Sequence, residues 1–324
     1  MSEPASPLRG QVRSRAWKPV SHGLYRLAGG DDEAWRDLEA WQLVLPPSGV
    51  FSHLTAASAY GWWTPPLPVD LPVFAAVSDP DPRPRRGGLR VSRHPRPIAW
   101  RQVRDVRLAT PAEALLACAC DLRLLDIIVL VDAALHCGDC TVSDIVDLVG
   151  QRRRGSPLLR RALAMADARS ESAWETLLRV LHVTCAVPVR PQFVVLDEAG
   201  AFVARGDLLL EGTKTLHEYD GAQHRTKPRH RTDLARERRI GNAVWTRRGY
   251  TDLEVLTKSV MILRDADRSL GRPHRPERIR AWHALLSESM FTASGRTQVR
   301  SRLGLPQRGT GHRMHGSGPK PCIS

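Results

Sequence analysis

Three carboxylates that could share one metal ion lie between residues 207 and 220: Asp207, Glu218 and Asp220. Carboxylate oxygens are the hard ligands that Mg²⁺ prefers, and one or two of them, together with waters and a phosphate oxygen, complete its octahedral shell. An ion held in this way polarises a scissile phosphate and lowers the pKa of the attacking water. The three residues therefore indicate metal-assisted hydrolysis of a phosphate ester.

Two further side chains could serve the same site. Glu218 and Asp220 are two residues apart, so their side chains share one face of an extended strand. Gly221 then permits a sharp turn, after which His224 could act as a general base near neutral pH. Glu175 could reach the same point from an upstream helix and orient a water.

A basic segment follows the carboxylates directly. Residues 222 to 248 contain nine basic and two acidic residues. Arginine can grip phosphate oxygens with two hydrogen bonds and offset the repulsion between a polyanion and the carboxylates. Lys227, Arg236 and Arg239 are the candidate phosphate contacts, so the segment favours nucleic acid as the partner.

The elements that must position these residues are predicted from residue 169 onward. A helix begins after Ser172, and three strands, a basic helix and a last strand follow it. Their predicted ranges are 172–181 for the helix, 192–196, 202–210 and 215–219 for the strands, 233–247 for the basic helix and 253–256 for the last strand.

In this order the motifs resemble a known family. Ser172-x-x-Glu175-x-x-x-Arg179, Arg205-x-Asp207, Glu218-x-Asp220-Gly221-x-x-His224 and Asp233-x-x-Arg236 are similar to those of very-short-patch-repair-like endonucleases and their Glu-x-Asp-Gly relatives in the PD-(D/E)XK nuclease superfamily. The resemblance implies a mixed sheet flanked by helices, a Mg²⁺ cofactor and hydrolysis of DNA phosphodiester bonds.

The resemblance also assigns roles to individual residues. Asp207 and Glu218 would be metal ligands, Asp220 a ligand or an anchor for a metal-bound water, and His224 the base. Glu175 would be an outer carboxylate that orients a water. Asp220 stands where the superfamily pattern has a lysine.

The N-terminal half of the chain contains different sequence motifs. Residues 17–26 read as a hairpin that turns at His22-Gly23, and they resemble the wing of the winged-helix module in AbiEi-type antitoxins, truncated here. Residues 51–59 and the helix that opens at Thr110 resemble the middle domain of those proteins. The expected fold class is α/β (α+β), with a winged-helix-like segment over 1–30, a middle region over 31–168, an endonuclease-like domain over 169–264 and a basic, mostly disordered tail over 265–324.

Net charge and hydropathy limit the classes of molecule that the protein could bind. The 324-residue chain carries a net charge of +14, and residues 265–324 contribute eleven basic and four acidic residues to it. No apolar run is long enough to cross a membrane, so we expect a cytoplasmic protein that acts on DNA and has no membrane partner. Two alternatives to an endodeoxyribonuclease remain: a non-catalytic DNA-binding or antitoxin-like regulator, and a protein that binds a partner in a toxin–antitoxin or defence system.

Overall fold

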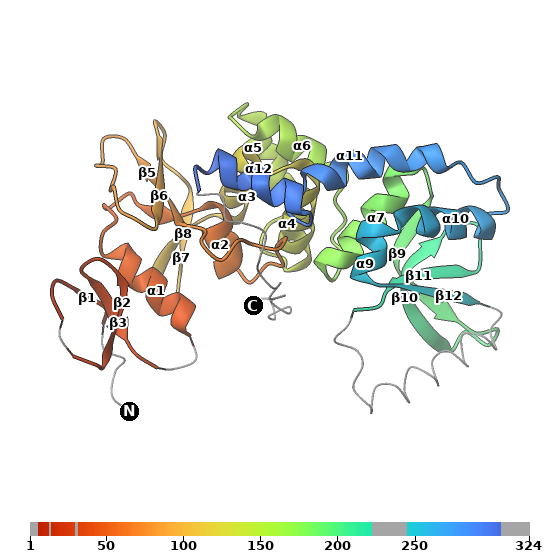
Figure 1. Cartoon of the computed structure of the whole chain (residues 1–324), viewed down its shortest axis with the longest axis horizontal. Helices are drawn as coiled ribbons and strands as arrows, with labels where there is room; N and C mark the ends of the chain where they lie inside the picture. Colours follow the sequence, from red (N-terminus) through yellow and green to blue (C-terminus); the bar gives the residue numbers. More distant parts are fainter. Residues whose placement is uncertain (1–5, 13, 30–31, 222–244, 306–324) are drawn as a thin grey trace.

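The computed structural model describes residues 6–12, 14–29, 32–221 and 245–305. These residues form three β-sheets flanked by helices, which confirms the α/β (α+β) class. Figure 1 shows the sheets spread along the long axis, with the N-terminal sheet at one end, the sheet of residues 189–250 at the other and a helical region between them.

The N-terminal sheet contains the predicted hairpin. Strands β2 (Trp17–Ser21) and β3 (Leu24–Leu27) pair antiparallel, and Gly23 adopts a φ of 65° at the turn between them, a conformation that glycine takes without strain. The hairpin prediction is therefore confirmed. The remaining elements of this region are β1 (Leu8–Arg9) and α1 (Glu33–Gln42).

The middle region combines a mixed five-stranded sheet, in the order β6-β5-β4-β8-β7, with helices that cover it. Its helices are rich in Leu, Ile, Val and Ala, and α4 is buried along most of its length, which the apolar sequence explains. The strands are β4 (Val50–Phe51), β5 (Val73–Ser78), β6 (Leu89–His94), β7 (Trp100–Val103) and β8 (Val106–Ala109), and the helices are α2 (His53–Ala59), α3 (Pro111–Asp121), α4 (Leu124–His136), α5 (Val142–Gly150) and α6 (Ser156–Leu163).

The C-terminal sheet carries the candidate site. Its strand order is β12-β11-β10-β9, with β11 and β12 parallel and the other pairs antiparallel, so the predicted mixed sheet is confirmed. Helix α7 packs against β9 and β11. The bounds are α7 (Ala173–Thr184), β9 (Val189–Leu196), β10 (Phe202–Leu210), β11 (Thr215–Tyr219) and β12 (Thr246–Tyr250).

Two predictions after residue 230 fail where the structure describes the chain. Residues 253–256 are not a strand but part of helix α9 (Asp252–Thr257), which opens with a capping box between Thr251 and Glu254. The last strand of the sheet is instead β12, so Thr246 and Arg247 are extended and not helical. The rest of the predicted basic helix, residues 233–244, lies outside the described residues.

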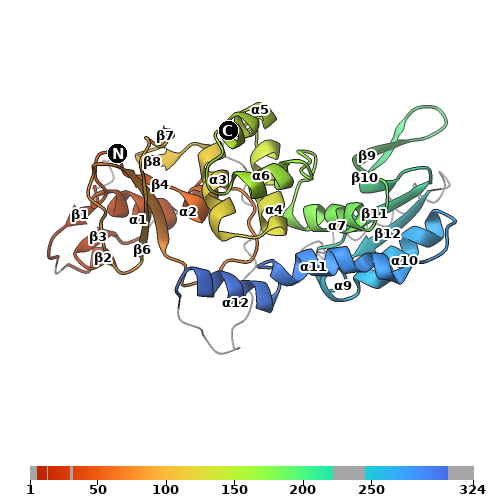
Figure 2. The same ribbon diagram turned by 90° about the horizontal axis from the view of Figure 1, so that it is seen from above.

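Residues 265–305 also differ from the expected tail, because they fold into helices with buried apolar side chains. Trp282 and Met290 are fully buried, and Phe291 and Leu303 nearly so. Figure 2 shows α11 and α12 returning from the C-terminal sheet along the helical middle region. The elements are α10 (Ser259–Ser269), the 3₁₀ helix η2 (Pro276–Ile279), α11 (Arg280–Glu288) and α12 (Ala293–Arg302). We call residues 280–305 the C-terminal strap.

One large apolar core runs through the molecule. It includes Leu24 of the hairpin, Leu130 of α4, Leu177 of α7 and Val299 of α12. A smaller cluster around Leu216, with Phe193 and Trp245 at its edge, covers the other face of the C-terminal sheet. No helix in the described part of the chain is long and apolar enough to span a bilayer.

Candidate functional site

Asp207 and Glu218 lie next to each other on neighbouring strands. Strands β10 and β11 pair Leu208 with His217, and continuing that antiparallel register by one residue sets Asp207 opposite Glu218. Residues opposed in this way have Cα atoms about 4.5–5.5 Å apart. The Asp207 carboxylate also accepts a hydrogen bond from the backbone N–H of Tyr219 at 2.8 Å, so it lies against the backbone beside Glu218.

An arginine joins the other two carboxylates. Arg247 donates from Nε to Glu218 Oε2 at 2.7 Å and from Nη2 to Asp220 Oδ1 at 2.6 Å. The Glu218 side chain is 4% exposed and that of Asp220 is 47% exposed. Although burial opposes it, the charges of Glu218 and Asp220 raise the pKa of the Arg247 guanidinium. We call these four residues, Asp207, Glu218, Asp220 and Arg247, the carboxylate–arginine cluster.

Gly249 makes room for the cluster. It pairs with Glu218 in the parallel register of β11 and β12, and a Cβ at this position would overlap the Asp220 carboxylate. The Asp220 side chain therefore lies over the backbone of β12, where any larger residue at position 249 would displace it. This explains why a glycine interrupts an otherwise β-prone strand.

Glu175 is held at the start of α7. Ser172 caps the helix by accepting a hydrogen bond from the Glu175 N–H, and its hydroxyl donates to Glu175 Oε1 at 3.0 Å. The N–H of Glu171 and the side-chain amide of Gln192 donate to Glu175 Oε2 at 2.9 and 2.8 Å. Burial raises the pKa of Glu175, and these hydrogen bonds oppose the rise. Gln192 pairs across β9 and β10 with Asp207 in the continued register, so Glu175 contacts the strand beside the cluster.

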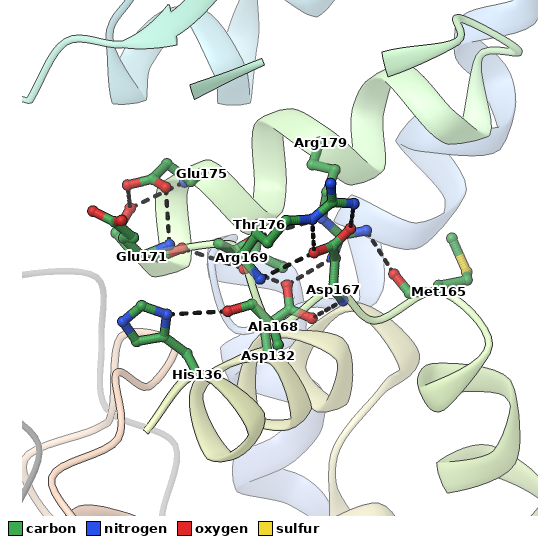
Figure 3. Close-up of polar contacts among 12 residues, drawn as sticks. Asp132, His136, Met165, Asp167, Ala168, Arg169, Glu171, Glu175, Thr176 and Arg179 are labelled. Carbon is green, nitrogen blue, oxygen red and sulfur yellow. Dashed lines mark hydrogen bonds and ion pairs between the residues drawn. The ribbon is translucent and has the colours of Figure 1, made fainter. Parts of the chain in front are cut away.

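A buried ion pair fixes the position of α7 against the middle region, as Figure 3 shows. Arg179 donates to Asp132 Oδ2 at 2.6 Å and to the Met165 carbonyl at 2.6 Å. The Thr176 hydroxyl and the Asp167 N–H also donate to Asp132, at 2.7 and 2.8 Å. Arg179 belongs to the Ser-x-x-Glu-x-x-x-Arg motif of the sequence, and the structure gives it this role of anchoring the helix that carries Glu175.

A chain of buried polar groups lies under the sheet on the α7 side. His182 bonds the Leu178 carbonyl through Nδ1 at 2.7 Å and His217 through Nε2 at 2.9 Å. The Tyr250 hydroxyl lies 3.4 Å from His217 Nε2 and donates to Asp265 at 3.3 Å. Burial lowers the pKa of His182 to about 4 and also lowers the pKa of His217. Both imidazoles are therefore neutral at neutral pH and position β11 by hydrogen bonding alone.

Four of the predicted site residues lie outside the described residues: His224, Lys227, Arg236 and Arg239. Among the predicted residues that are described, the structure brings Asp207, Glu218 and Asp220 together and connects Glu175 to them through Gln192. Within residues 6–12, 14–29, 32–221 and 245–305, no group of three or more His, Cys, Asp or Glu side chains is arranged to hold a metal ion.

Arg247, Gly249 and Gln192 are the residues of this site that sequence reasoning missed. Arg247 was assigned to the basic helix. The Thr251-x-x-Glu254 capping box marks a new helix at residue 252, and the Trp, Thr and Tyr residues just before it favour a strand. Together these two signals favour a strand that contains Arg247 and Gly249, but its pairing with the strand of Glu218 is visible only in the structure.

Two proteins of Mycobacterium tuberculosis are similar to this chain. The uncharacterized protein Rv2248 of strain H37Rv is 29% identical over 244 residues, which cover 73% of this chain and 86% of the relative. The uncharacterized protein MT2308 of strain CDC 1551 matches to the same extent. No protein-family model matches the chain, and no solved structure matches it. Both relatives are described only as uncharacterized, so the functional argument depends on the site itself.

Proposed function

We propose that residues 169–264 form a DNA endonuclease domain, in which a Mg²⁺ ion bound by Asp207 and Glu218 assists hydrolysis of a phosphodiester bond. The observation that supports this proposal is the adjacency of the two carboxylates across β10 and β11, with the Asp207 side chain hydrogen-bonded to the N–H between Glu218 and Asp220. The motif order of the sequence points to the same chemistry.

The donor set suits a hard divalent cation. Mg²⁺ is commonly bound through one or two carboxylates, with waters and substrate phosphate oxygens as its other ligands. Asp207 and Glu218 would supply the protein ligands, and Asp220 would hold a metal-bound water. When bound, the ion would polarise the phosphate and lower the pKa of the attacking water.

The chain's own residues prepare the site. Arg247 holds Glu218 and Asp220 in place through two charge-assisted hydrogen bonds, which are stronger than neutral ones. The Tyr219 N–H fixes the Asp207 carboxylate. In this proposal His224 removes a proton from the attacking water, Lys227, Arg236 and Arg239 contact DNA phosphates, and Glu175 steadies the β9 side of the site through Gln192.

The assay that tests the proposal is nicking of duplex and single-stranded DNA by the full chain with Mg²⁺. We expect Asp207→Ala to lower the cleavage rate by about 100-fold or more, because loss of a metal ligand removes several kcal/mol of transition-state stabilisation. Asp147→Ala, which alters an exposed carboxylate on α5, is the matched control. Equal cleavage by wild type and Asp207→Ala would contradict the proposal.

A second candidate function is a non-catalytic DNA-binding or antitoxin-like regulator. The observation that favours it is Arg247, which already supplies a cation to Glu218 and Asp220. A regulator would bind DNA in a salt-dependent manner, retain that binding in Asp207→Ala, and show no cleavage in the wild type. Absence of DNA binding at low salt would count against both functions and favour a protein partner of a toxin–antitoxin or defence system.

A further inference from the structure

An arginine-lined groove of about 490 Å³ lies in the N-terminal half of the molecule, apart from the carboxylate–arginine cluster. Arg83, Arg85, Arg86 and Arg90 line it, and no acidic residue does so in the part of the chain that the structure describes. Its apolar lining includes Leu303 of the C-terminal strap. We call it the arginine groove.

The charge of the groove is not neutralised by ion pairs. Arg86 donates to the His22 carbonyl at 2.6 Å and Arg90 to the Leu303 carbonyl at 2.9 Å. A carbonyl orients a guanidinium without cancelling its charge. Within the described residues, no carboxylate lies within 4 Å of the guanidinium groups of the four groove arginines. Arg86 and Arg90 are therefore held in place without loss of charge, and Arg83 and Arg85 are exposed to an anion.

The Asp121 carboxyl interacts with the charge of Arg90, but it does not cancel the positive charge of the groove. Burial raises the pKa of Asp121, and Arg90, Arg154 and Arg302 oppose that rise. Three arginines therefore share the influence of one partly buried carboxyl. The charges of these three arginines and Asp121 therefore sum to a positive value around Arg90.

The loop that carries Arg83 and Arg85 is stiff. Both arginines are exposed, and each follows a proline, Pro82 or Pro84. Because the proline ring fixes φ, the loop loses little backbone freedom when it meets a ligand. The two exposed guanidinium groups are presented by a backbone that is already ordered.

The C-terminal strap completes the groove. Arg300 forms a two-point ion pair with Asp70, at 2.5 and 2.8 Å, and Arg302 donates to the Asp121 carbonyl at 3.0 Å. These contacts hold Leu303 beside β6, where Arg90 meets its carbonyl. Residues more than 200 positions apart in sequence therefore build one site, and Figure 2 shows α12 passing β6.

We propose that the arginine groove binds the phosphodiester backbone of DNA without reading its sequence. Planar guanidinium groups match phosphate oxygens and can donate two hydrogen bonds to them. Among the described residues, no aromatic side chain lines the groove, so these residues offer no surface on which bases would stack. Figure 1 places β6 toward the opposite end of the molecule from β11, so this contact does not depend on hydrolysis at the candidate site.

The experiment measures binding of a fluorescein-labelled DNA duplex by anisotropy, over a salt series and with EDTA present. The variant is Arg83→Gln/Arg85→Gln in the full chain. Each lost phosphate contact reduces the slope of log affinity against log salt by about 0.9, so the double variant is expected to reduce it by about 1.8 and to weaken binding about tenfold at about 0.1 M salt. Both residues are exposed, and thermal unfolding confirms that the fold is retained.

The control is Arg160→Gln/Arg161→Gln, which removes the same charge from two exposed positions on α6. A change in slope no larger than that of the control would overturn the proposal. Displacement of DNA from the wild type by micromolar inorganic pyrophosphate, but not from the Arg83→Gln/Arg85→Gln variant, would also overturn it, because the groove would then be a site for a small phosphate ligand.

The groove proposal and the endonuclease proposal can be contradicted independently of each other. If wild type binds DNA with the expected slope change and does not nick it, the groove proposal stands and the endonuclease proposal fails. If nicking depends on Asp207 while the slope is unchanged in Arg83→Gln/Arg85→Gln, the endonuclease proposal stands and the groove proposal fails.

Discussion

At the residue scale, Arg247 is the side chain on which the geometry of the carboxylate–arginine cluster depends. It bonds Glu218, which is almost fully buried, and Asp220, which is half exposed. Truncating one partner of a buried ion pair leaves the other charge without compensation, and this typically costs 3–5 kcal/mol, whereas an exposed pair contributes about 0–1 kcal/mol. Arg247 therefore matters for stability as well as for the site.

We expect Arg247→Gln to lower the free energy of unfolding by about 2–3 kcal/mol, because it removes a charge-assisted hydrogen bond to Glu218, whose side chain is 4% exposed. If Asp207 and Glu218 bind Mg²⁺, adding about 10 mM Mg²⁺ should restore part of that loss, since the ion then replaces the missing charge. Urea denaturation with and without Mg²⁺ measures both effects.

The matched control for this measurement is Arg190→Gln, which breaks the exposed ion pair with Glu211. The Arg190→Gln substitution should lower the free energy of unfolding by no more than about 1 kcal/mol. A similar loss in Arg190→Gln and Arg247→Gln would show that Arg247 has no special role. A loss in Arg247→Gln that Mg²⁺ does not alter would count against metal binding at Glu218.

At the element scale, a buried carboxyl joins helix α4 to the connection between α11 and α12. Asp126 is fully buried and accepts hydrogen bonds from the Ser289 hydroxyl and from the Met290 N–H, the latter at 3.1 Å. Burial raises its pKa from an ordinary value near 3.8 to about 7, and these hydrogen bonds oppose the rise. Between those two values the folded protein retains a proton that the unfolded chain has released.

Asp126 should therefore make the fold less stable as pH rises from about 4 to about 7, because the folded state binds more protons than the unfolded state in this window. Asp126→Asn keeps the acceptor oxygen and cannot ionise. Relative to wild type, the variant should gain on the order of a few kcal/mol between about pH 4.5 and pH 7.5. Urea unfolding at several pH values measures this difference.

Asp147→Asn, at an exposed position of α5, is the control and should show no such trend. A stability difference between wild type and Asp126→Asn that is constant across the pH range would contradict the assignment of a proton to buried Asp126.

Most elements of residues 169–264 could be predicted from the sequence, because local patterns encode them. The apolar stripe of α7 and the Ser172 cap both depend on near neighbours. Strand β12 could not be inferred with the same ease. Its residues include two arginines, and what stabilises them in extended form is the contact of Arg247 with carboxylates about 30 residues earlier in the chain. The positions of Asp207 and Glu218 followed from motif order, whereas Arg247, the partner of Glu218 and Asp220, did not.

At the scale of the whole molecule, the C-terminal strap connects the two ends. Phe291 lies with its edge toward the Trp174 ring at 5.2 Å, and Trp174 stacks on Tyr219 at 5.4 Å. Arg300 and Arg302 hold the end of the strap to the middle region. The prediction of a tail over 265–324 followed from overall charge and composition, but Trp282, Leu286 and Val299 are spaced widely and become a core only by packing on distant helices.

Because one apolar core runs through both halves, we expect calorimetry to show a single cooperative unfolding transition. Phe291→Ala should lower the free energy of unfolding by about 3–5 kcal/mol, as loss of a buried aromatic ring does. It should therefore lower the midpoint temperature of the whole transition by several degrees. Two transitions, of which only one moves in Phe291→Ala, would contradict the view that the strap joins the halves into one unit.

Metal-dependent cleavage by Asp207 is tested by the rate of plasmid nicking as a function of Mg²⁺ concentration, for wild type and Asp207→Asn. The substitution keeps the shape of the side chain and the acceptor for the Tyr219 N–H and removes the charge that would bind the ion. We expect Mg²⁺-dependent nicking by wild type and a rate lower by about 100-fold or more in Asp207→Asn at every Mg²⁺ concentration. Equal rates for the two proteins, or no nicking by wild type at any Mg²⁺ concentration, would contradict it.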